Sequence, residues 1–245
     1  MNKHVFDKSK LPSRHVSVGP ARAPHRSYYY AMGMTSEEIA QPFIGVATCW
    51  NEAAPCNISL NRQAQSVKIG VKSAAGTPRE FTTITVTDGI AMGHEGMRSS
   101  LASREAIADT VELTMRGHCY DAIVGLAGCD KSLPGMMMAM VRLNTPSVFI
   151  YGGSILPGRL NGKDVTVQDV FEAVGQHQAV IYPPMIWRNL KPLPARQLVP
   201  VGDNLPRIPW HVSQKLSALL CLTHLGHRHL TNLAINTLLL QVRQS

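Results

Sequence analysis

The stretch GLAGCDKSLPGMMMAM at residues 125–140 decides the fold of this chain. It continues an apolar run, DAIVGLAG, which is typical of a strand buried on both faces of a parallel sheet. A Ser-Leu-Pro-Gly turn follows, and then a Met-rich apolar segment that favours a helix beginning near Pro134. Cys129, Asp130 and Lys131 would therefore lie at the carboxyl end of a strand, where open α/β sheets place their ligands.

The flanking sequence repeats this alternation of strand and helix. Strands are expected at 43–50, 81–90, 121–128 and 146–153, with helices at 58–76, 101–118, 134–143 and 167–177. This order predicts the α/β class, with a parallel sheet, right-handed crossovers and flanking helices. Residues 1–30 are basic and are expected to be irregular, with Tyr28–Tyr30 packing inward or joining a subunit contact.

Length and composition indicate a globular protein. The 245 residues, 44% hydrophobic and 16% charged, suffice for one large domain or two small ones. No uncharged apolar run reaches about 18 residues, so we expect no membrane span, and the N-terminus lacks the apolar segment of a secretory signal. The five cysteines fit a reducing compartment, so we expect a cytoplasmic location.

The net charge of +8 is unevenly distributed along the chain. Residues 1–177 carry 17 Lys and Arg against 15 Asp and Glu, whereas residues 178–245 carry 7 against one. The basic character therefore belongs mostly to the last quarter of the chain. No nucleic-acid-binding motif accompanies it, and we expect no nucleic-acid partner.

Three strand ends each supply candidate metal ligands: Cys56, Asp88 and the triplet 129–131. Thiolates suit iron–sulfur clusters or zinc, whereas carboxylates suit magnesium, so the combination suggests two metals of different hardness. The alternative is that each cysteine is a small buried apolar residue and each aspartate caps a turn. There is no CxxC pair, and the residues alone leave both interpretations open.

Other chemically reactive side chains are expected to have structural roles. Cys49 lies within a predicted strand and Cys119 at a helix end, so both are expected to pack. His94 is expected to face water, and the methionines of 136–140 to fill the core. The histidines of 224–229 have no acidic or cysteine partner nearby, so we do not expect them to bind a metal.

Residues 12–179 resemble the amino-terminal part of the dihydroxy-acid and sugar-acid dehydratase family. The resemblance is carried by RAPHRSYYYAMG, PFIGVATCWNEAAPCN, REFTTITVTDGIAMGHEGMRSSLASRE, ELTMRGHCYDAIVGLAGCDKSLPGMMMAM and GGSILPG. It implies an iron–sulfur hydro-lyase of branched-chain amino-acid biosynthesis, which converts 2,3-dihydroxy-3-methyl acids to 2-keto acids. A sugar acid or phosphogluconate is the alternative substrate class, and TVTDGIAMGHEGMRSSL favours the branched-chain acid.

The resemblance also implies a set of ligands. Cys56 and Cys129 would bind a [2Fe–2S] cluster, while Asp88, Asp130 and Lys131 would bind Mg²⁺, the lysine as its carbamate. It implies a homodimer with the site between domains, and a serine base from a carboxyl-terminal barrel domain. That barrel has no counterpart in these 245 residues, so no catalytic residue is assigned in this chain.

The resemblance stops at about residue 179. We therefore expect a dehydratase domain at 1–179 and an irregular, poorly ordered, non-native tail at 180–245, which is punctuated by proline and then rich in leucine. The family's third cluster cysteine would follow in a segment resembling ACPTAGSCGGQFTANTMACVSE. Residues 193–215 stand in its place as LPARQLVPVGDNLPRIPWHVSQK.

The genetic code relates these two segments. When the third base of each codon is joined to the first two of the next, Trp210 and His211 must give GCA, alanine. His211 with Val212 permits TGT, cysteine, and continuing from Leu193 the permitted codons spell the whole family segment. We infer that the reading frame shifts near residues 179–180 and that the tail is translated out of frame.

Two hypotheses for the function of this polypeptide follow. In the first it is an active dihydroxy-acid dehydratase, and in the second it is a truncated, non-catalytic form of that enzyme. We favour the second, because two cysteines cannot supply three cluster ligands and the base is missing. Cys221 lies in a leucine-rich context that gives no reason to expect it as the replacement ligand. Uncovered apolar surfaces would also make the chain poorly soluble.

Overall fold

The computed structural model of this chain describes residues 7–152, 155 and 157–178. These residues divide between two compact units, the first ending at Gly152. The first unit contains a four-stranded sheet in the order β2-β1-β3-β4. Its strands are β1 (Phe43–Thr48), β2 (Thr77–Thr82), β3 (Ala122–Ala127) and β4 (Ser147–Tyr151), and every neighbouring pair is parallel. The predicted α/β fold with a parallel sheet and flanking helices is confirmed.

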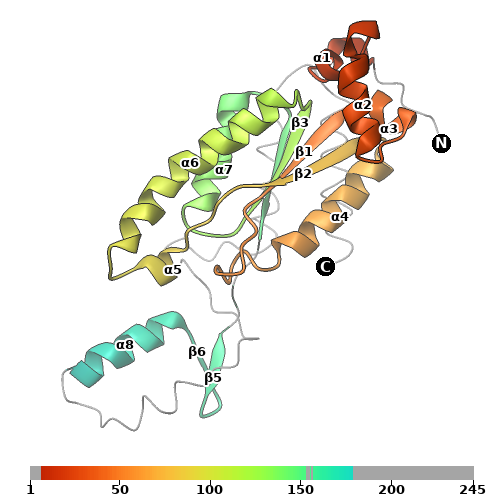
Figure 1. The fold of residues 1–245 in the computed structure, drawn as a ribbon. Helices are drawn as coiled ribbons and strands as arrows, with labels where there is room; N and C mark the ends of the chain where they lie inside the picture. Colours follow the sequence, from red (N-terminus) through yellow and green to blue (C-terminus); the bar gives the residue numbers. More distant parts are fainter. Residues whose placement is uncertain (1–6, 153–154, 156, 179–245) are drawn as a thin grey trace. The chain divides into compact units, whose positions relative to one another are not determined.

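Helices cover both faces of this sheet. Helix α4 (Leu60–Ser73) lies on one side, while α6 (Gly96–Gly117) and α7 (Ser132–Leu143) lie together on the other (Figure 1). The central strands β1 and β3 are buried at every position. Burial on both faces explains why their sequences are continuous apolar runs rather than alternating ones.

The methionines of α7 pack into the core, as predicted. Met136 and Met140 are buried, and a Cβ atom at Gly125 of β3 would lie within 2.7 Å of Met136 and 2.4 Å of Met140. Glycine at this position therefore lets the helix lie close against the sheet. The flexible thioether side chains then fill the space that a larger strand residue would take.

The second strand differs from its predicted bounds of 81–90. It ends at Thr82, which pairs with Thr48, the last residue of β1. Among the described strands none continues beside it past this point, so the β-branched run of 83–87 leaves the sheet despite its propensity. Asp88 is consequently the first residue of a short helix, α5 (Asp88–Ala91), rather than a residue directly after a strand.

The expectation of an irregular N-terminus is wrong for residues 7–30. This segment forms η1 (Lys8–Lys10), α1 (Arg14–Ser17), η2 (Pro20–Arg22) and α2 (Ala23–Ala31), with α3 (Ser36–Ala40) following. These helices are short, and α2 contains no buried residue, so no apolar periodicity marks it in the sequence. Tyr29 packs edge-on against Phe43, with ring centroids 5.2 Å apart, while Tyr28 is exposed.

The second unit contains an antiparallel hairpin and one helix among its described residues. Strands β5 (Gly158–Leu160) and β6 (Lys163–Val165) are joined by Asn161 and Gly162, which both have positive φ, as tight hairpin turns require. Helix α8 (Val167–Gln178) agrees with the predicted helix. The tail at 180–245, with its histidines at 224–229, lies outside the described residues.

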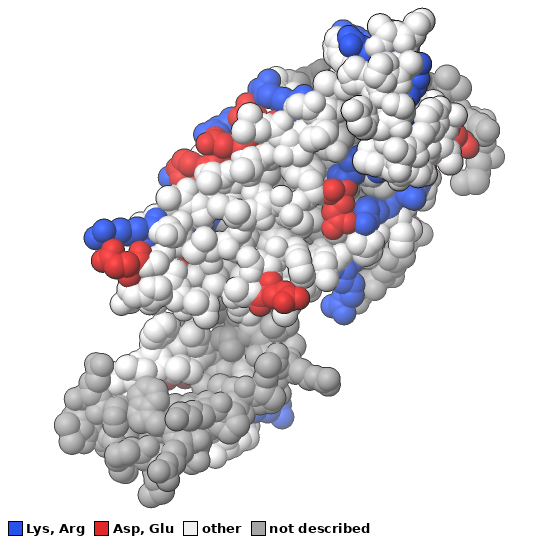
Figure 2. All heavy atoms as spheres, viewed as in Figure 1, with Lys and Arg blue, Asp and Glu red and all other residues white. Residues whose placement is uncertain are grey.

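Charged side chains of opposite sign lie next to each other on the face shown in Figure 2. Helix α6 and its N-cap residue Glu95 carry three ion pairs: Arg98–Glu95, Arg104–Glu105 and Arg116–Glu112. Lys68 of α4 pairs with Glu80 of β2 at 2.5 Å. Within the described part of the chain, no helix has the length and apolar character needed to cross a membrane.

Candidate functional site

Two cysteines meet at the carboxyl edge of the sheet. Cys56 lies in the loop between β1 and α4, and Cys129 lies in the loop between β3 and α7. Their Sγ atoms are 2.7 Å apart, and both thiols are free and buried. The two central strands thus bring together cysteines that are 73 residues apart in the sequence.

Glycine at two positions allows this approach. A Cβ atom at Gly128 would lie 2.1 Å from the backbone oxygen of Cys56 and 2.8 Å from Asn57 Oδ1. At Gly152, after β4, it would lie 2.7 Å from Leu60 and 3.1 Å from the same Cys56 oxygen. A larger residue at Gly128 would therefore displace the loop that carries Cys56.

A hydrogen bond joins the two thiols. The hydrogen bond between them, aided by burial, raises the pKa of Cys56. The same hydrogen bond lowers the pKa of Cys129 to about 7, because the Cys56 thiol donates to the Cys129 thiolate. The backbone N–H of Cys129 donates to Ser132 Oγ at 2.9 Å, which fixes the loop beside it. The pair therefore offers one thiolate near neutral pH, and thiolates are the form of cysteine that binds metals.

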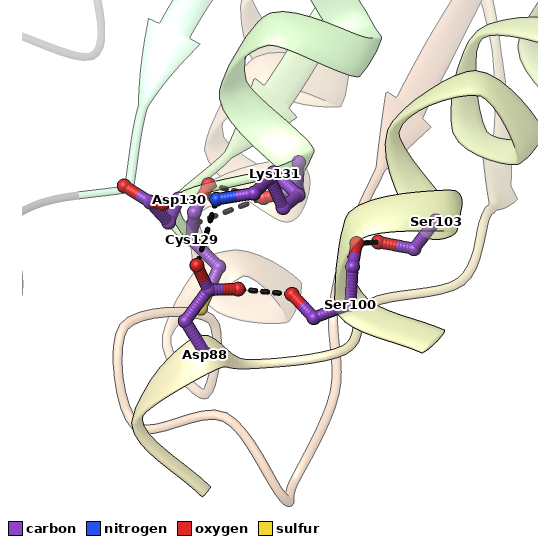
Figure 3. A network of polar contacts seen from close by, with 7 residues as sticks. Asp88, Ser100, Ser103, Cys129, Asp130 and Lys131 are labelled. Atoms are coloured by element: carbon purple, nitrogen blue, oxygen red, sulfur yellow. Dashed lines mark hydrogen bonds and ion pairs between the residues drawn. The ribbon is translucent and has the colours of Figure 1, made fainter. Parts of the chain in front are cut away.

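A lysine joins two carboxylates beside this cysteine pair. Lys131 Nζ lies 2.7 Å from Asp88 Oδ2 and 2.5 Å from Asp130 Oδ2. Figure 3 shows Asp88 rising from α5 toward Lys131, which comes from the loop that also carries Cys129. The side chains of Asp88 and Lys131 are largely buried, whereas that of Asp130 is half exposed.

The charges of this group stabilise one another. Burial disfavours the carboxylate form of Asp88, but hydrogen bonds from Lys131 and Ser100 outweigh it, and the pKa of Asp88 is lowered. Hydrogen bonds to Asp130 and Asp88 raise the pKa of Lys131. In the unmodified protein the ammonium group is thus a cation bound between two carboxylates.

All five residues singled out in the sequence lie at this edge of the sheet. Because residues 129–131 are consecutive, the thiol pair and the carboxylate pair are adjacent. No group of three or more His, Cys, Asp and Glu side chains in the described residues is arranged to hold a metal ion. The donors form two separate pairs, one soft and one hard, together with the lysine.

The donor chemistry fits two different metals. Two neighbouring thiols are half of the four-cysteine set that usually binds an iron–sulfur cluster. Two carboxylates already hold a cation between them, and oxygen ligands of this kind are those that Mg²⁺ prefers. A carbamate on Lys131 would replace the ammonium with a further anionic oxygen ligand. The residues present therefore fit part of a cluster site and part of a magnesium site.

The other reactive residues have structural surroundings. Cys49 is fully buried directly after β1, and burial raises the pKa of its thiol to about 12. Cys119 has a positive φ of 54° in the turn after α6, where its thiol contacts a helix carbonyl, and is only partly buried. The exposed imidazole of His94 contacts the Ile90 carbonyl. These positions agree with the structural roles expected for Cys49 and His94, whereas Cys119 is less tightly packed than predicted.

Two serines at this edge were not found from the sequence. Ser100 of α6 donates to Asp88, and Ser132 of α7 contacts the backbone of Cys129. Ser100 lies just before the helix predicted at 101–118, whereas α6 begins four residues before Ser100, at Gly96. Nothing distinguishes a buried serine in the sequence from an exposed one, so only its neighbours in the fold indicate a role.

Comparison with known proteins shows the family to which this chain belongs. Residues 41–183 match the family model described as "Dihydroxy-acid/6-phosphogluconate dehydratase N-terminal", a range that contains all five residues. The chain is 88% identical over 182 residues to the dihydroxy-acid dehydratase of Dinoroseobacter shibae, covering 74% of this chain and 32% of that protein. It is 84% identical over 179 residues to the Parvibaculum lavamentivorans dihydroxy-acid dehydratase, covering 73% and 31%.

A more distant relative is also a dihydroxy-acid dehydratase. The dihydroxy-acid dehydratase of Sulfurisphaera tokodaii is 56% identical over 171 residues, covering 70% of this chain and 30% of that protein. The chain thus spans about a third of the length of the curated relatives it matches. It belongs to the dihydroxy-acid/6-phosphogluconate dehydratase family, and residues 41–183 are that family's N-terminal region.

Proposed function

We propose that this chain derives from a dihydroxy-acid dehydratase, a hydro-lyase that converts 2,3-dihydroxy-3-methyl acids to 2-keto acids in isoleucine and valine biosynthesis. High identity to proteins of that name supports the activity class. The observation that carries the proposal is the meeting of a thiol pair and a carboxylate pair at one sheet edge. We further propose a cytoplasmic enzyme that acts as a homodimer.

In this proposal Cys56 and Cys129 hold a [2Fe–2S] cluster. Asp88, Asp130 and Lys131 hold Mg²⁺, with Lys131 as its carbamate. When bound, the two metal centres supply electrostatic and Lewis-acid assistance for loss of the C2 proton and the C3 hydroxyl group. The protein's part is to bind the metals and to orient the acid between them.

The burial of the five side chains indicates how a substrate would reach them. Cys56, Cys129 and Asp88 are buried, whereas the Asp130 side chain is half exposed. A small acid would therefore approach from the Asp130 side. The buried thiol pair would remain shielded from water by the loops after β1 and β3, which protects a cluster from solvent.

We also propose that the 245-residue polypeptide does not itself catalyse the dehydration. The described residues contain two of the three cluster cysteines that the resemblance implies, and the resemblance places the serine base in the barrel domain rather than in these residues. Because catalysis depends on the mutual positioning of all these groups, half of a site is not expected to retain activity. The tail at 180–245, which we infer to be out of frame, would hold the missing cysteine in the restored frame.

Iron analysis of the purified chain tests this proposal. We expect substoichiometric iron and no visible absorption typical of a [2Fe–2S] cluster. A chain with the frame restored after residue 179 should bind iron and show that absorption, and its Cys129→Ser variant should not. A full complement of iron and a cluster spectrum in the unaltered chain would contradict the truncated-site interpretation.

A sugar acid is the second substrate class, because the matching family model also covers 6-phosphogluconate dehydratases. The frame-restored enzyme separates the two classes. We expect turnover of 2,3-dihydroxy-isovalerate to exceed that of 6-phosphogluconate and other sugar acids. Higher turnover of a sugar acid than of 2,3-dihydroxy-isovalerate would assign the chain to the sugar-acid branch of the family.

A further inference from the structure

The two oxygens of Asp88 have different partners. Oδ2 accepts a hydrogen bond from Lys131 Nζ at 2.7 Å, and the same Nζ lies 2.5 Å from Asp130 Oδ2. Oδ1 accepts from the hydroxyl of Ser100, on the other side of the carboxylate (Figure 3). The carboxylate is therefore held from both ends, and only one oxygen points to the position of the cation.

A rigid element positions the Ser100 hydroxyl. Ser100 is fully buried in the second turn of α6, a helix that packs along α7 and against α5. The hydroxyl of Ser103, one turn further on, donates to the Ser100 carbonyl at 2.6 Å and does not reach Asp88. A hydroxyl on a packed helix is held more firmly than one on a loop, so it can fix the rotation of the carboxylate.

We propose that Ser100 is a positioning residue that keeps Asp88 a single-oxygen ligand and thereby favours a small, strictly octahedral cation. This inference rests on the proposed magnesium site. With Oδ1 engaged by Ser100, Asp88 presents only Oδ2. Mg²⁺ and the similar Mn²⁺ accept such ligands in regular geometry, whereas Ca²⁺ readily takes both oxygens of a carboxylate.

Removing the hydroxyl has two consequences. Oδ1 loses its donor in a buried position, and the carboxylate gains freedom to turn toward the cation with both oxygens. The loss of a hydrogen bond that orients a metal ligand typically weakens metal binding by about 10-fold to 100-fold. Bidentate binding would partly compensate this loss for Ca²⁺ but not for Mn²⁺.

The test compares Ser100→Ala with Ser103→Ala in the full 245-residue chain, with bicarbonate present to allow carbamate formation. Mn²⁺ binding is followed by electron paramagnetic resonance of the free ion, and Ca²⁺ binding by competition with Mn²⁺. We expect Ser100→Ala to raise the Mn²⁺ dissociation constant by about 10-fold to 100-fold and the Ca²⁺ constant by less. Ser103→Ala, a matched buried serine on the same helix, should leave the ratio of the two constants unchanged.

The outcomes separate this inference from the proposed site. Suppose that the unaltered chain binds Mn²⁺ and that Ser100→Ala has the same dissociation constants for Mn²⁺ and Ca²⁺ as the unaltered chain. The metal site is then supported and the role of Ser100 is refuted. An equal loss for both ions would also refute it, since that indicates a structural defect only. If the unaltered chain binds no Mn²⁺, the proposed metal site of this chain fails.

A crystal structure of metal-free Ser100→Ala decides the positioning role without any metal. We expect the Asp88 carboxylate to rotate away from its orientation in the unaltered chain. An unchanged carboxylate would show that Lys131 alone holds Asp88, and would overturn the proposal.

Discussion

Cys129 is the residue whose chemistry depends most on a single neighbour. Its thiol is buried, which by itself disfavours the thiolate, yet the hydrogen bond from Cys56 lowers its pKa to about 7. The two thiols therefore form a coupled pair, in which the protonation of one depends on that of the other. A residue that is only apolar filler would show the opposite behaviour, as Cys49 does, whose pKa is raised to about 12.

Titration of the metal-free chain tests this pairing. The thiolate of Cys129 should be lost as the pH falls through about 7, because its pKa is depressed, and be fully formed well above that pH. Cys56→Ala removes the donor, so burial should then move the midpoint upward. Thiolate ultraviolet absorbance measures both midpoints.

Cys119→Ala is the control for that titration, since the Cys119 thiol donates to the Arg116 carbonyl and is not part of the Cys56–Cys129 pair. Its removal should leave the low midpoint in place. A midpoint that stays near 7 in Cys56→Ala would show that the two thiols are not coupled.

The loops after β1 and β3 depend on close backbone packing. Gly128 has no room for a Cβ atom, since the nearest atom, the Cys56 backbone oxygen, would be 2.1 Å away. Backbone atoms cannot move aside cheaply. We expect Gly128→Ala to lower the free energy of unfolding by about 3 kcal/mol or more, measured by urea denaturation.

Gly117, at the end of α6, is the matched control because no atom of the described residues lies within 4 Å of its Cβ position. Gly117→Ala should be neutral or stabilising by up to about 1 kcal/mol, since alanine favours a helix. Equal effects of the two substitutions would mean that the Cys56 loop does not lie against β3.

A buried carboxylate holds the N-terminal helices at the opposite edge of the sheet. Asp121 accepts hydrogen bonds from the backbone and hydroxyl of Ser13 and from the backbone of Phe43, at 2.6–2.8 Å. Burial raises its pKa in spite of these donors. Residues 108 positions apart are thereby joined through one side chain.

Asp121→Ala should cost about 3 kcal/mol of unfolding free energy, because three donors lose their acceptor. Asp109→Ala is the comparison, since its ion pair with Arg142 at 2.7 Å lies on the surface and is worth at most about 1 kcal/mol. Thermal unfolding followed by circular dichroism measures the difference. Similar melting temperatures for the two variants would count against Asp121 as an anchor.

The sequence predicts the elements of the core better than those outside it. Strands β1, β3 and β4 and helices α4, α6 and α7 follow from apolar runs and periodicity, which report burial directly. The segment 83–87 was misjudged because a strand ends where its partner ends, whatever its propensity. The N-terminal helices were missed because they are short and are held by contacts such as that of Asp121 rather than by an apolar face.

The candidate site, like the fold, could be predicted only in part from the sequence. Strand ends indicated Cys56, Asp88 and the 129–131 triplet, because parallel strands point their carboxyl ends to one edge. The pairing of the thiols, the bridging position of Lys131 and the contribution of Ser100 depend on distances that no spacing in the sequence contains.

At the scale of the whole molecule, the chain contains the N-terminal region of the dihydroxy-acid/6-phosphogluconate dehydratase family. It spans about a third of its curated relatives, and the family match ends at residue 183. The codon relation at 193–215 offers a specific reason: the bases that encode this segment can also encode the family's cysteine-containing segment. We therefore expect activity to depend on the reading frame and not on the described residues alone.

Turnover of 2,3-dihydroxy-isovalerate tests this account most directly. The 245-residue chain and a chain with its frame restored after residue 179 are assayed side by side for the 2-keto acid, with Mg²⁺ present and iron and sulfide supplied. The account predicts product from the restored chain and none from the 245-residue chain. Comparable turnover by the 245-residue chain would contradict it.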